Sequence, residues 1–313
     1  MKSSAIGWAA TLEPKVTLGI CVHNCEEYIK DAIHSILEQD FAHESMSLIF
    51  VDDGSNDGTL SIIKEYVSRI DMPADIIQTS WKGIGHARNV VISKACGKYV
   101  LWVDGDMVLS KDFVRTLVYF MEEHVGVGIA KGKQSLNPGA NMVSTLEAYS
   151  RAASRMLDYQ SKKARSKALG TGGSIYRIEA IKHVGGFDEN LRYYGEDWDI
   201  EIRIRDAGWT LCVVDTEFSD YERRGLTWGS LWRKYWLRGY YSHYFFHKNG
   251  NLLRTHRMFP FVAFVGSLLQ SRKLYRLTRR KFVFLLPIHS LFKTLAQYVG
   301  FVKSHLNSYE PCL

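Results

Sequence analysis

Two acidic turns, LIFVDDGSNDGT (Leu48–Thr59) and YVLWVDGDMVL (Tyr99–Leu109), decide how this chain is expected to fold. In each, a run of β-branched and aromatic residues stops at aspartates and glycine. Such runs are typical of buried parallel strands, and open α/β folds place their ligands at the carboxyl ends of these strands. Asp104 and Asp106 flank a single glycine, so their oxygens suit a divalent cation that would in turn hold a diphosphate.

The sequence around the two turns predicts that strands and helices alternate. VTLGICV (Val16–Val22) is expected to form a first strand, and residues 26–38 carry apolar side chains at helical spacing. A second helix should follow the turn at Asn56–Gly58, and a short third strand should contain residues 76–77. A third helix then ends at Gly97. This alternation predicts an α/β fold with a doubly wound, mostly parallel sheet.

Two more helices are expected beyond the second acidic turn. One covers residues 141–160, and the other covers residues 196–207 and ends before Gly208. Glu196 and Asp197 fall in the first turn of the second of these helices, where the helix dipole favours negative charge.

Composition limits the class of protein. The chain has 313 residues, 46% hydrophobic and 23% charged, which argues against wholesale disorder. Its five cysteines are odd in number and form no CxxC pair, so a disulfide framework or a zinc site is not expected. A reducing, cytosolic setting fits better. The apolar patch at the start is short and broken by Glu13, so no signal peptide is expected there.

The net charge of +7 is divided unevenly along the chain. Residues 223–313 carry sixteen Lys and Arg against one acid, whereas residues 1–222 carry twenty-four against thirty-two. A basic segment attached to a neutral-to-acidic body implies an anionic partner, either nucleic acid or lipid headgroups.

The basic segment also contains two apolar stretches with RKLYRLTRRK between them. Residues 258–269 are too few to span a bilayer, which needs roughly 20 apolar residues. Residues 282–302 are interrupted by Pro287, His289 and Lys293. We therefore expect helices that lie on an anionic membrane.

Five motifs in order carry a resemblance to a known family. They are VDDGSNDGT, GIGHARN, WVDGD, GTGGSIYR with VGGFDE, and GEDWD. Over residues 16 to 215 the chain resembles the family 2 glycosyltransferases of the GT-A fold. GIGHARN begins like a dinucleotide fingerprint, but Arg88 replaces its third glycine and it follows the third expected strand, so a nicotinamide-binding fold is disfavoured.

The resemblance implies a donor site for a nucleoside-diphosphate sugar. Asp53 would bind the base, and His23 stands where relatives often carry an aromatic residue over the base. Arg88 would contact the nucleotide or its phosphates. Asp106 would coordinate Mg²⁺ or Mn²⁺, and Asp104 would touch the ribose or donor sugar, through the ion or directly.

The resemblance also implies an acceptor site. The strip GTGGS (Gly170–Ser174), with Gly172 and Gly173, would let a sugar approach the backbone closely. Glu196 would lie beside the acceptor, and Asp197 would deprotonate the acceptor hydroxyl. For Asp197, as for Asp53 in the donor site, simple capping of a turn or helix is the structural alternative.

Taken together, the sequence predicts an inverting, metal-dependent glycosyltransferase. Residues 1–222 would form the GT-A domain, and residues 223–313 a basic, aromatic, helical region that associates peripherally with the cytoplasmic face of the cell membrane. The acceptor would be a lipid-linked or other glycan, with no nucleic-acid partner. Many relatives carry a histidine metal ligand where this chain has FSDYERR, so Asp220 is a candidate substitute.

Three alternatives stay open from the sequence. A polyprenyl-phosphate monoglycosyl synthase would use the lipid phosphate itself as acceptor and would need no hydroxyl deprotonation. A non-enzymatic nucleic-acid-binding protein would use the basic C-terminal segment. A sugar-nucleotide-binding scaffold would bind the donor without turnover.

Overall fold

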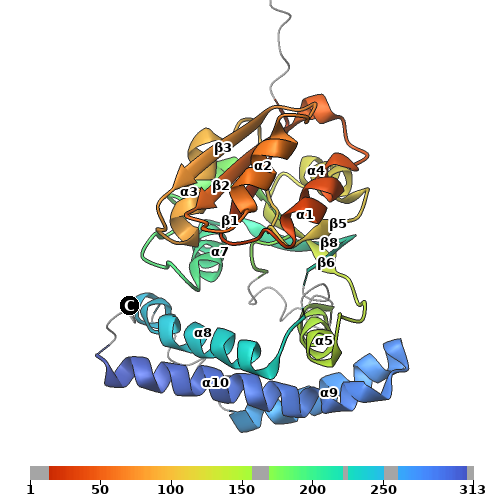
Figure 1. The fold of residues 1–313 in the computed structure, drawn as a ribbon, viewed down its shortest axis with the longest axis vertical. Helices are drawn as coiled ribbons and strands as arrows, with labels where there is room; N and C mark the ends of the chain where they lie inside the picture. Colours follow the sequence, from red (N-terminus) through yellow and green to blue (C-terminus); the bar gives the residue numbers. More distant parts are fainter. Residues whose placement is uncertain (1–13, 157–168, 221–224, 250–259, 309–313) are drawn as a thin grey trace, which may run out of the picture.

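The computed structural model describes residues 14–156, 169–220, 225–249 and 260–308. Within them, one eight-stranded sheet carries helices on both faces, and further helices form a C-terminal layer (Figure 1). The strands are β1 (Val16–Val22), β2 (Met46–Asp53), β3 (Ala74–Thr79), β4 (Tyr99–Trp102), β5 (Val108–Leu109), β6 (Val127–Gln134), β7 (Ser174–Arg177) and β8 (Thr210–Ser219). The helices are α1 (Ile29–Leu37), α2 (Thr59–Val67), α3 (Ile84–Lys94), α4 (Phe113–Glu123), α5 (Met142–Met156), α6 (Ile178–His183), α7 (Glu196–Asp206), α8 (Trp228–Lys248), α9 (Pro260–Thr278) and α10 (Leu286–Leu306), with short 3₁₀ helices η1 (His43–Ser45) and η5 (Lys281–Leu285).

The sheet has the strand order β3-β2-β1-β4-β7-β6-β8-β5. β3, β2, β1 and β4 are parallel, as predicted, whereas β7 is antiparallel to both of its neighbours. Ile175 of β7 lies opposite Leu101 of β4. Because β7 enters from the other end of the sheet, the residues just before it meet the residues just after β4. The reversed strand therefore brings the glycine strip to the DGD turn.

Two hydrophobic layers hold the sheet. α1, α2 and α4 pack on one face through residues such as Ile33, Ile63 and Leu117. α3, α6 and α7 pack on the other face, where Val91 and Ile204 are fully buried. Burial of each such side chain contributes about 1.5–3 kcal/mol to the free energy of folding. The strands that carry the candidate site residues are therefore held in place by tight packing.

The strand β2 shows why its pattern could be read from the sequence. All eight residues of MSLIFVDD are buried, because a central parallel strand is covered on both faces. The strand stops where Gly54 takes a φ of 78°, a conformation that other residues rarely adopt. The strands expected at residues 16–22 and 76–77, and the helix that begins at Glu196, are likewise confirmed.

Helix α5 links the sheet to the C-terminal helices. It accounts for the helix expected at residues 141–160 as far as Met156, and residues 157–160 lie outside the described residues. Leu146 and Tyr149 of α5 form a buried cluster with Leu274 of α9 and Leu286 of α10.

Helices α8, α9 and α10 form the layer drawn below the sheet in Figure 1. α8 and α10 pack closely because glycines at their contact have no side chain. A Cβ on Gly239 would collide with the carbonyl of Gln297, and a Cβ on Gly300 with that of Trp236. A helical C-terminal region that is rich in aromatic and basic residues is therefore confirmed.

The outward face of α9 and α10 is apolar. Its exposed large side chains include Phe261, Val262, Val265, Leu268, Leu269, Ile288, Leu291, Leu295, Val299 and Val302. By length and composition alone, the segment Lys281–Leu306 is apolar enough to cross a membrane, and 39% of its most apolar window is buried against the protein.

Candidate active site

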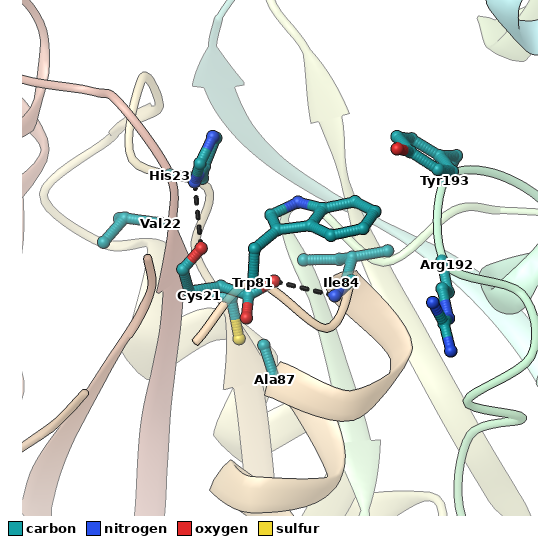
Figure 2. A pocket seen from close by; sticks show the side chains of 10 residues that line it. Cys21, Val22, His23, Trp81, Ile84, Ala87, Arg192 and Tyr193 are labelled. Atoms are coloured by element: carbon teal, nitrogen blue, oxygen red, sulfur yellow. Dashed lines mark hydrogen bonds between the residues drawn. The ribbon is translucent and has the colours of Figure 1, made fainter. Parts of the chain in front are cut away.

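A cavity of about 200 Å³ opens at the carboxyl ends of β1 and β2. Val22, His23 and Asp53 line it from the strand ends, and Trp81 and Tyr193 line it from two loops. Figure 2 shows the Trp81 ring extending toward Tyr193, with His23 on the other side of Trp81. The two residues predicted for the base, Asp53 and His23, thus line the same cavity.

The Asp53 carboxylate holds the loop between β3 and α3. One oxygen accepts hydrogen bonds from the Thr79 hydroxyl at 2.8 Å and the Lys82 amide at 3.0 Å, and the other accepts from the Gly83 amide at 2.8 Å. The His23 Nδ1 lies 2.9 Å from the Asp53 carbonyl oxygen. Asp53 therefore caps a loop, and base binding by this residue and by His23 stays a prediction.

The glycines of GIGHARN allow two distant parts of the chain to touch. A Cβ on Gly83 would collide with the backbone of Arg192, and a Cβ on Gly85 with the carbonyl oxygen of Asp188. The Ile84 amide donates to the Arg192 carbonyl at 3.2 Å. The two glycines of the motif thus allow α3 and the loop before α7 to pack in close contact.

Three aromatic rings connect the cavity with the C-terminal helices. The Trp81 and Tyr193 ring centroids are 4.9 Å apart, and Tyr193 stacks on Tyr241 of α8 at 4.0 Å. Sequence analysis did not identify Trp81, although a tryptophan two residues before the GIGHARN motif was a usable signal.

The DGD turn places two carboxylates at the end of β4. Asp106 is buried, and burial together with the charge of Asp106 raises the pKa of Asp104 above its usual value. Gly172 lies so close to the Asp104 carboxylate that any Cβ there would collide with it. The glycine is therefore required for the strip to lie on this carboxylate.

Arg88 joins the donor side of the site to the acceptor side. Its Nη1 lies 2.5 Å from Glu196 Oε1, and its guanidinium is 5.8 Å from the Trp102 ring and 5.4 Å from the Phe187 ring. Burial lowers the pKa of Arg88, but the charges of Glu196 and Asp104 outweigh burial, so the pKa is raised and the group stays charged. In this structure Arg88 is paired with the predicted acceptor-side carboxylate, and phosphate contact stays a prediction.

Asp197 follows Glu196 in the first turn of α7. Its Oδ1 accepts a hydrogen bond from the Trp198 amide at 2.8 Å, and its side chain is half-buried. Burial and the charge of Asp197 raise the pKa of Glu196 to about 7, against the opposing effect of Arg88. The predicted acid pair, the DGD turn and Arg88 therefore belong to one charged cluster.

Two charged residues that sequence analysis missed hold the glycine strip. Glu201 of α7 accepts hydrogen bonds from the Leu169 and Gly170 amides, each at 2.6 Å. Lys131 of β6 donates to the Gly170 carbonyl at 2.9 Å and to the Gly172 carbonyl. Both side chains are fully buried, and burial raises the pKa of Glu201 to about 8.

The carboxylates of the DGD turn fit a divalent cation. Asp106 is buried and Asp104 beside it is half-buried, and the repulsion between the two carboxylates would be relieved by a bound cation. Within the described ranges, no group of three or more His, Cys, Asp or Glu is arranged to hold a metal. Asp220 instead accepts from the Gln134 amide at 2.5 Å. Two carboxylates leave coordination positions of such an ion open to water or to the phosphate oxygens of a substrate.

The DGD turn, the glycine strip and the acidic pair at a helix start lie together at one edge of the sheet, as the resemblance to family 2 glycosyltransferases implies. The profile of glycosyl transferase family 2 matches residues 17–185, and the chain belongs to this family. The resemblance predicted from the motifs is confirmed, and membership of this family supports the prediction of an enzyme.

The curated proteins that match this chain include bacterial glycan-biosynthesis proteins. The poly(ribitol-phosphate) beta-N-acetylglucosaminyltransferase TarS of Staphylococcus aureus strain Mu50 is 32% identical over 110 residues, 35% of this chain and 19% of TarS. The minor teichoic acid biosynthesis protein GgaB of Bacillus subtilis strain 168 is 27% identical over 186 residues, 56% of this chain and 19% of GgaB. The chain thus matches about a fifth of the length of each of these relatives.

Solved structures confirm the fold. A crystal structure of S. aureus TarS residues 1–349 has a TM-score of 0.53 at 18% identity, over 94% of this chain and 92% of that one. The mannosyltransferase PcManGT of Pyrobaculum calidifontis, solved with GDP-Man and Mn²⁺, has a TM-score of 0.65 at 17% identity, over 93% and 88%. The predicted GT-A fold is therefore confirmed.

Proposed function

We propose that the protein is an inverting, metal-dependent glycosyltransferase that moves a sugar from a nucleoside-diphosphate sugar to a hydroxyl group of a lipid-linked glycan. The observation that carries this proposal is the charged cluster formed by Asp104, Asp106, Arg88, Glu196 and Asp197. In this cluster, Asp104 and Asp106 are suited to hold a cation that binds a diphosphate, and Asp197 is a separate carboxylate suited to accept a proton.

In the proposed reaction, Asp197 accepts the proton of the acceptor hydroxyl. The acceptor oxygen forms a bond to the anomeric carbon from the face opposite the diphosphate, and the bond from that carbon to the diphosphate oxygen breaks with its electron pair. Mg²⁺ or Mn²⁺ held by Asp106 and Asp104 would neutralise charge on the departing diphosphate. Arg88 acts by orienting Glu196, and thereby the first turn of α7 that carries Asp197.

The donor proposal is supported by the structures of related folds. TarS residues 1–349 have been solved with UDP and with UDP-GlcNAc, and PcManGT with GDP-Man and Mn²⁺. For this chain we propose a nucleoside-diphosphate sugar whose base enters the cavity lined by His23, Asp53 and Trp81.

The acceptor proposal rests on the relatives and on the C-terminal helices. TarS is named for poly(ribitol phosphate) and GgaB for minor teichoic acid, which supports a surface glycan as acceptor. The apolar face of α9 and α10 supports attachment to the cytoplasmic face of the cell membrane, with no nucleic-acid partner. Six cations lie at the end of α9 and the start of η5, where they could meet anionic headgroups: Arg272, Lys273, Arg276, Arg279, Arg280 and Lys281.

A panel of UDP-, GDP- and dTDP-sugars tests this function. Each is incubated with Mn²⁺ or Mg²⁺ and with glycan acceptors, both lipid-linked and free, and release of nucleoside diphosphate is measured. We expect release with one base class, and loss of release in EDTA. No release from any pairing would contradict the proposal, and full activity in EDTA would contradict the metal.

A further inference from the structure

The backbone of the glycine strip is held from two sides by buried polar side chains, an acidic one at its amides and a basic one at its carbonyls. We propose that Lys131 and Glu201 are positioning residues that fix the strip against Asp104 and thereby set where the acceptor meets the donor sugar. The placement of the strip follows from contacts within the chain, and only the effect on the acceptor rests on the proposed function.

Glu201 holds the amide side of the strip. Its two carboxylate oxygens accept separate hydrogen bonds from the Leu169 and Gly170 amides, both at 2.6 Å, so neither oxygen is free to rotate away. Glu201 stands four residues after Asp197, which places both side chains on the same face of α7. The helix that carries the predicted base therefore also holds the strip.

Lys131 holds the carbonyl side of the strip. Its ammonium donates to the carbonyls of Gly170 and Gly172, the first at 2.9 Å, and lies 5.4 Å from the Phe218 ring. The Gly170 carbonyl also accepts from the Ser174 hydroxyl at 2.7 Å. A lysine with three rotatable donors can reach two carbonyls that a single neutral donor could not.

The strip needs such restraint because of its own sequence. Gly170 and Gly173 have φ angles of 76° and 71°, and glycine has more conformations to lose than any other residue. At the same time, Gly172 leaves no room between its backbone and the Asp104 carboxylate. A small displacement of the strip would therefore disturb the DGD turn directly, and misplacement by about 1 Å can slow a reaction about 10²-fold.

Hydrogen exchange tests the placement without any substrate. In Glu201→Gln, one acceptor oxygen is replaced by a donor that faces an amide, so exchange of the Leu169 and Gly170 amides should be about 10-fold faster. Lys131→Met should loosen the same peptide, and Lys131→Arg, which keeps a buried cation, should restore part of the protection. The matched controls are Lys133→Met, whose ammonium lies in an exposed pair with Asp215, and Glu179→Gln on the exposed side of α6.

Two further measurements separate positioning from general destabilisation. The affinity for UDP with Mn²⁺ should stay within about 2-fold in Glu201→Gln, while turnover with the donor and acceptor that the panel identifies should fall about 10²-fold. Unchanged exchange at Leu169 and Gly170 would overturn the proposal. The proposal would also be overturned if Lys131→Met lost both UDP affinity and thermal stability and Lys131→Arg restored neither. If wild-type protein binds none of UDP, GDP and dTDP, the proposed function fails while the exchange result still decides the placement.

Discussion

The sheet and helix α10 differ in the side chains that they bury and expose. In the sheet, residues such as Leu18 and Phe50 are fully buried. In α10 the buried face includes His289, Lys293 and Ser304, while Ile288, Leu295 and their apolar neighbours face outward. The sheet buries its apolar side chains, whereas α10 exposes many of its own to solvent. The difference supports the proposal that the outward face of the helical layer contacts a membrane.

Both regions also bury charge, but they use it differently. In the site, Arg88 and Glu196 meet beside groups suited to chemistry. In the helical layer, Lys293 lies 2.8 Å from Glu147 of α5, which also accepts from the Tyr235 hydroxyl at 2.8 Å. Removing one member of a buried pair leaves an uncompensated charge, so this second cluster fastens the helices to α5.

The largest effect is expected at the DGD turn. Asp106→Ala removes a predicted ligand whose side chain belongs to neither hydrophobic cluster of the sheet, so turnover should fall at least about 10³-fold while the fold persists. Donor turnover and circular dichroism measure the two parts. Asp215→Ala, an exposed carboxylate on β8, is the control and should behave like wild type. Normal turnover in Asp106→Ala would remove this residue from the site.

The next effect is expected at the start of α7. Asp197→Asn keeps the shape of the side chain but loses the basic oxygen, so the chemical rate should fall about 10²–10⁴-fold while the donor still binds. Single-turnover kinetics and a UDP titration separate these steps. If chemistry were unchanged, the acceptor would need no deprotonation, as in a polyprenyl-phosphate monoglycosyl synthase.

A smaller effect is expected on the outward face of α10. Replacing Leu291 and Leu295 together by Ser removes two side chains that would enter the acyl boundary, so partitioning to anionic vesicles should weaken about 10–10²-fold. Flotation at low and high salt measures it. Val125→Ser, at a residue 75% exposed between α4 and β6, should leave binding unchanged. Wild-type protein that stays off anionic vesicles at low salt would contradict the membrane proposal. Release by detergent alone would indicate a spanning helix instead.

The smallest effect is expected on the free energy of unfolding when the pH is lowered. Burial and the Lys293 charge lower the pKa of His289 to about 3, against 6.5 for an unperturbed histidine. The unfolded chain therefore binds a proton at His289 that the folded chain excludes, and stability should fall as pH drops from about 6.5 toward 3, by at most about 1.4 kcal/mol per pH unit. The lowered pKa of Glu147 adds a loss below about pH 4.5 in the same direction.

Urea unfolding at pH 7, 6 and 5 checks this expectation. His289→Leu should flatten the dependence, because the excluded proton is gone, whereas substitution of the exposed His183 by Leu should not. Identical slopes in wild type and His289→Leu would show that His289 is not the group responsible.

The sheet could be predicted because its signals are local. β2 ends at Asp53 and β4 ends just before the DGD turn, as the alternation of apolar runs and turns indicated. The predicted donor residues His23 and Asp53 do line one cavity, although the Asp53 carboxylate is engaged with its own loop.

The interactions that could not be predicted are distant in sequence. Arg88 and Glu196 are 108 residues apart, and Lys293 and Glu147 are 146 apart. Lys131 sits in an ordinary-looking strand, and nothing local marks the carbonyls of Gly170 and Gly172 as its partners. Such pairs are brought together by the topology of the fold, and the spacing of residues along the sequence does not reveal them.

The stacked rings of Trp81, Tyr193 and Tyr241 have a thermodynamic consequence. Tyr193 contacts the cavity wall on one side and helix α8 on the other. A ligand that displaces Tyr193 must change the free energy of its stack on α8. By reciprocity, whatever restrains α8 must change the affinity of that ligand by the same factor. The affinity of the cavity for such a ligand therefore depends on what α8 contacts, and not only on the residues that line the cavity.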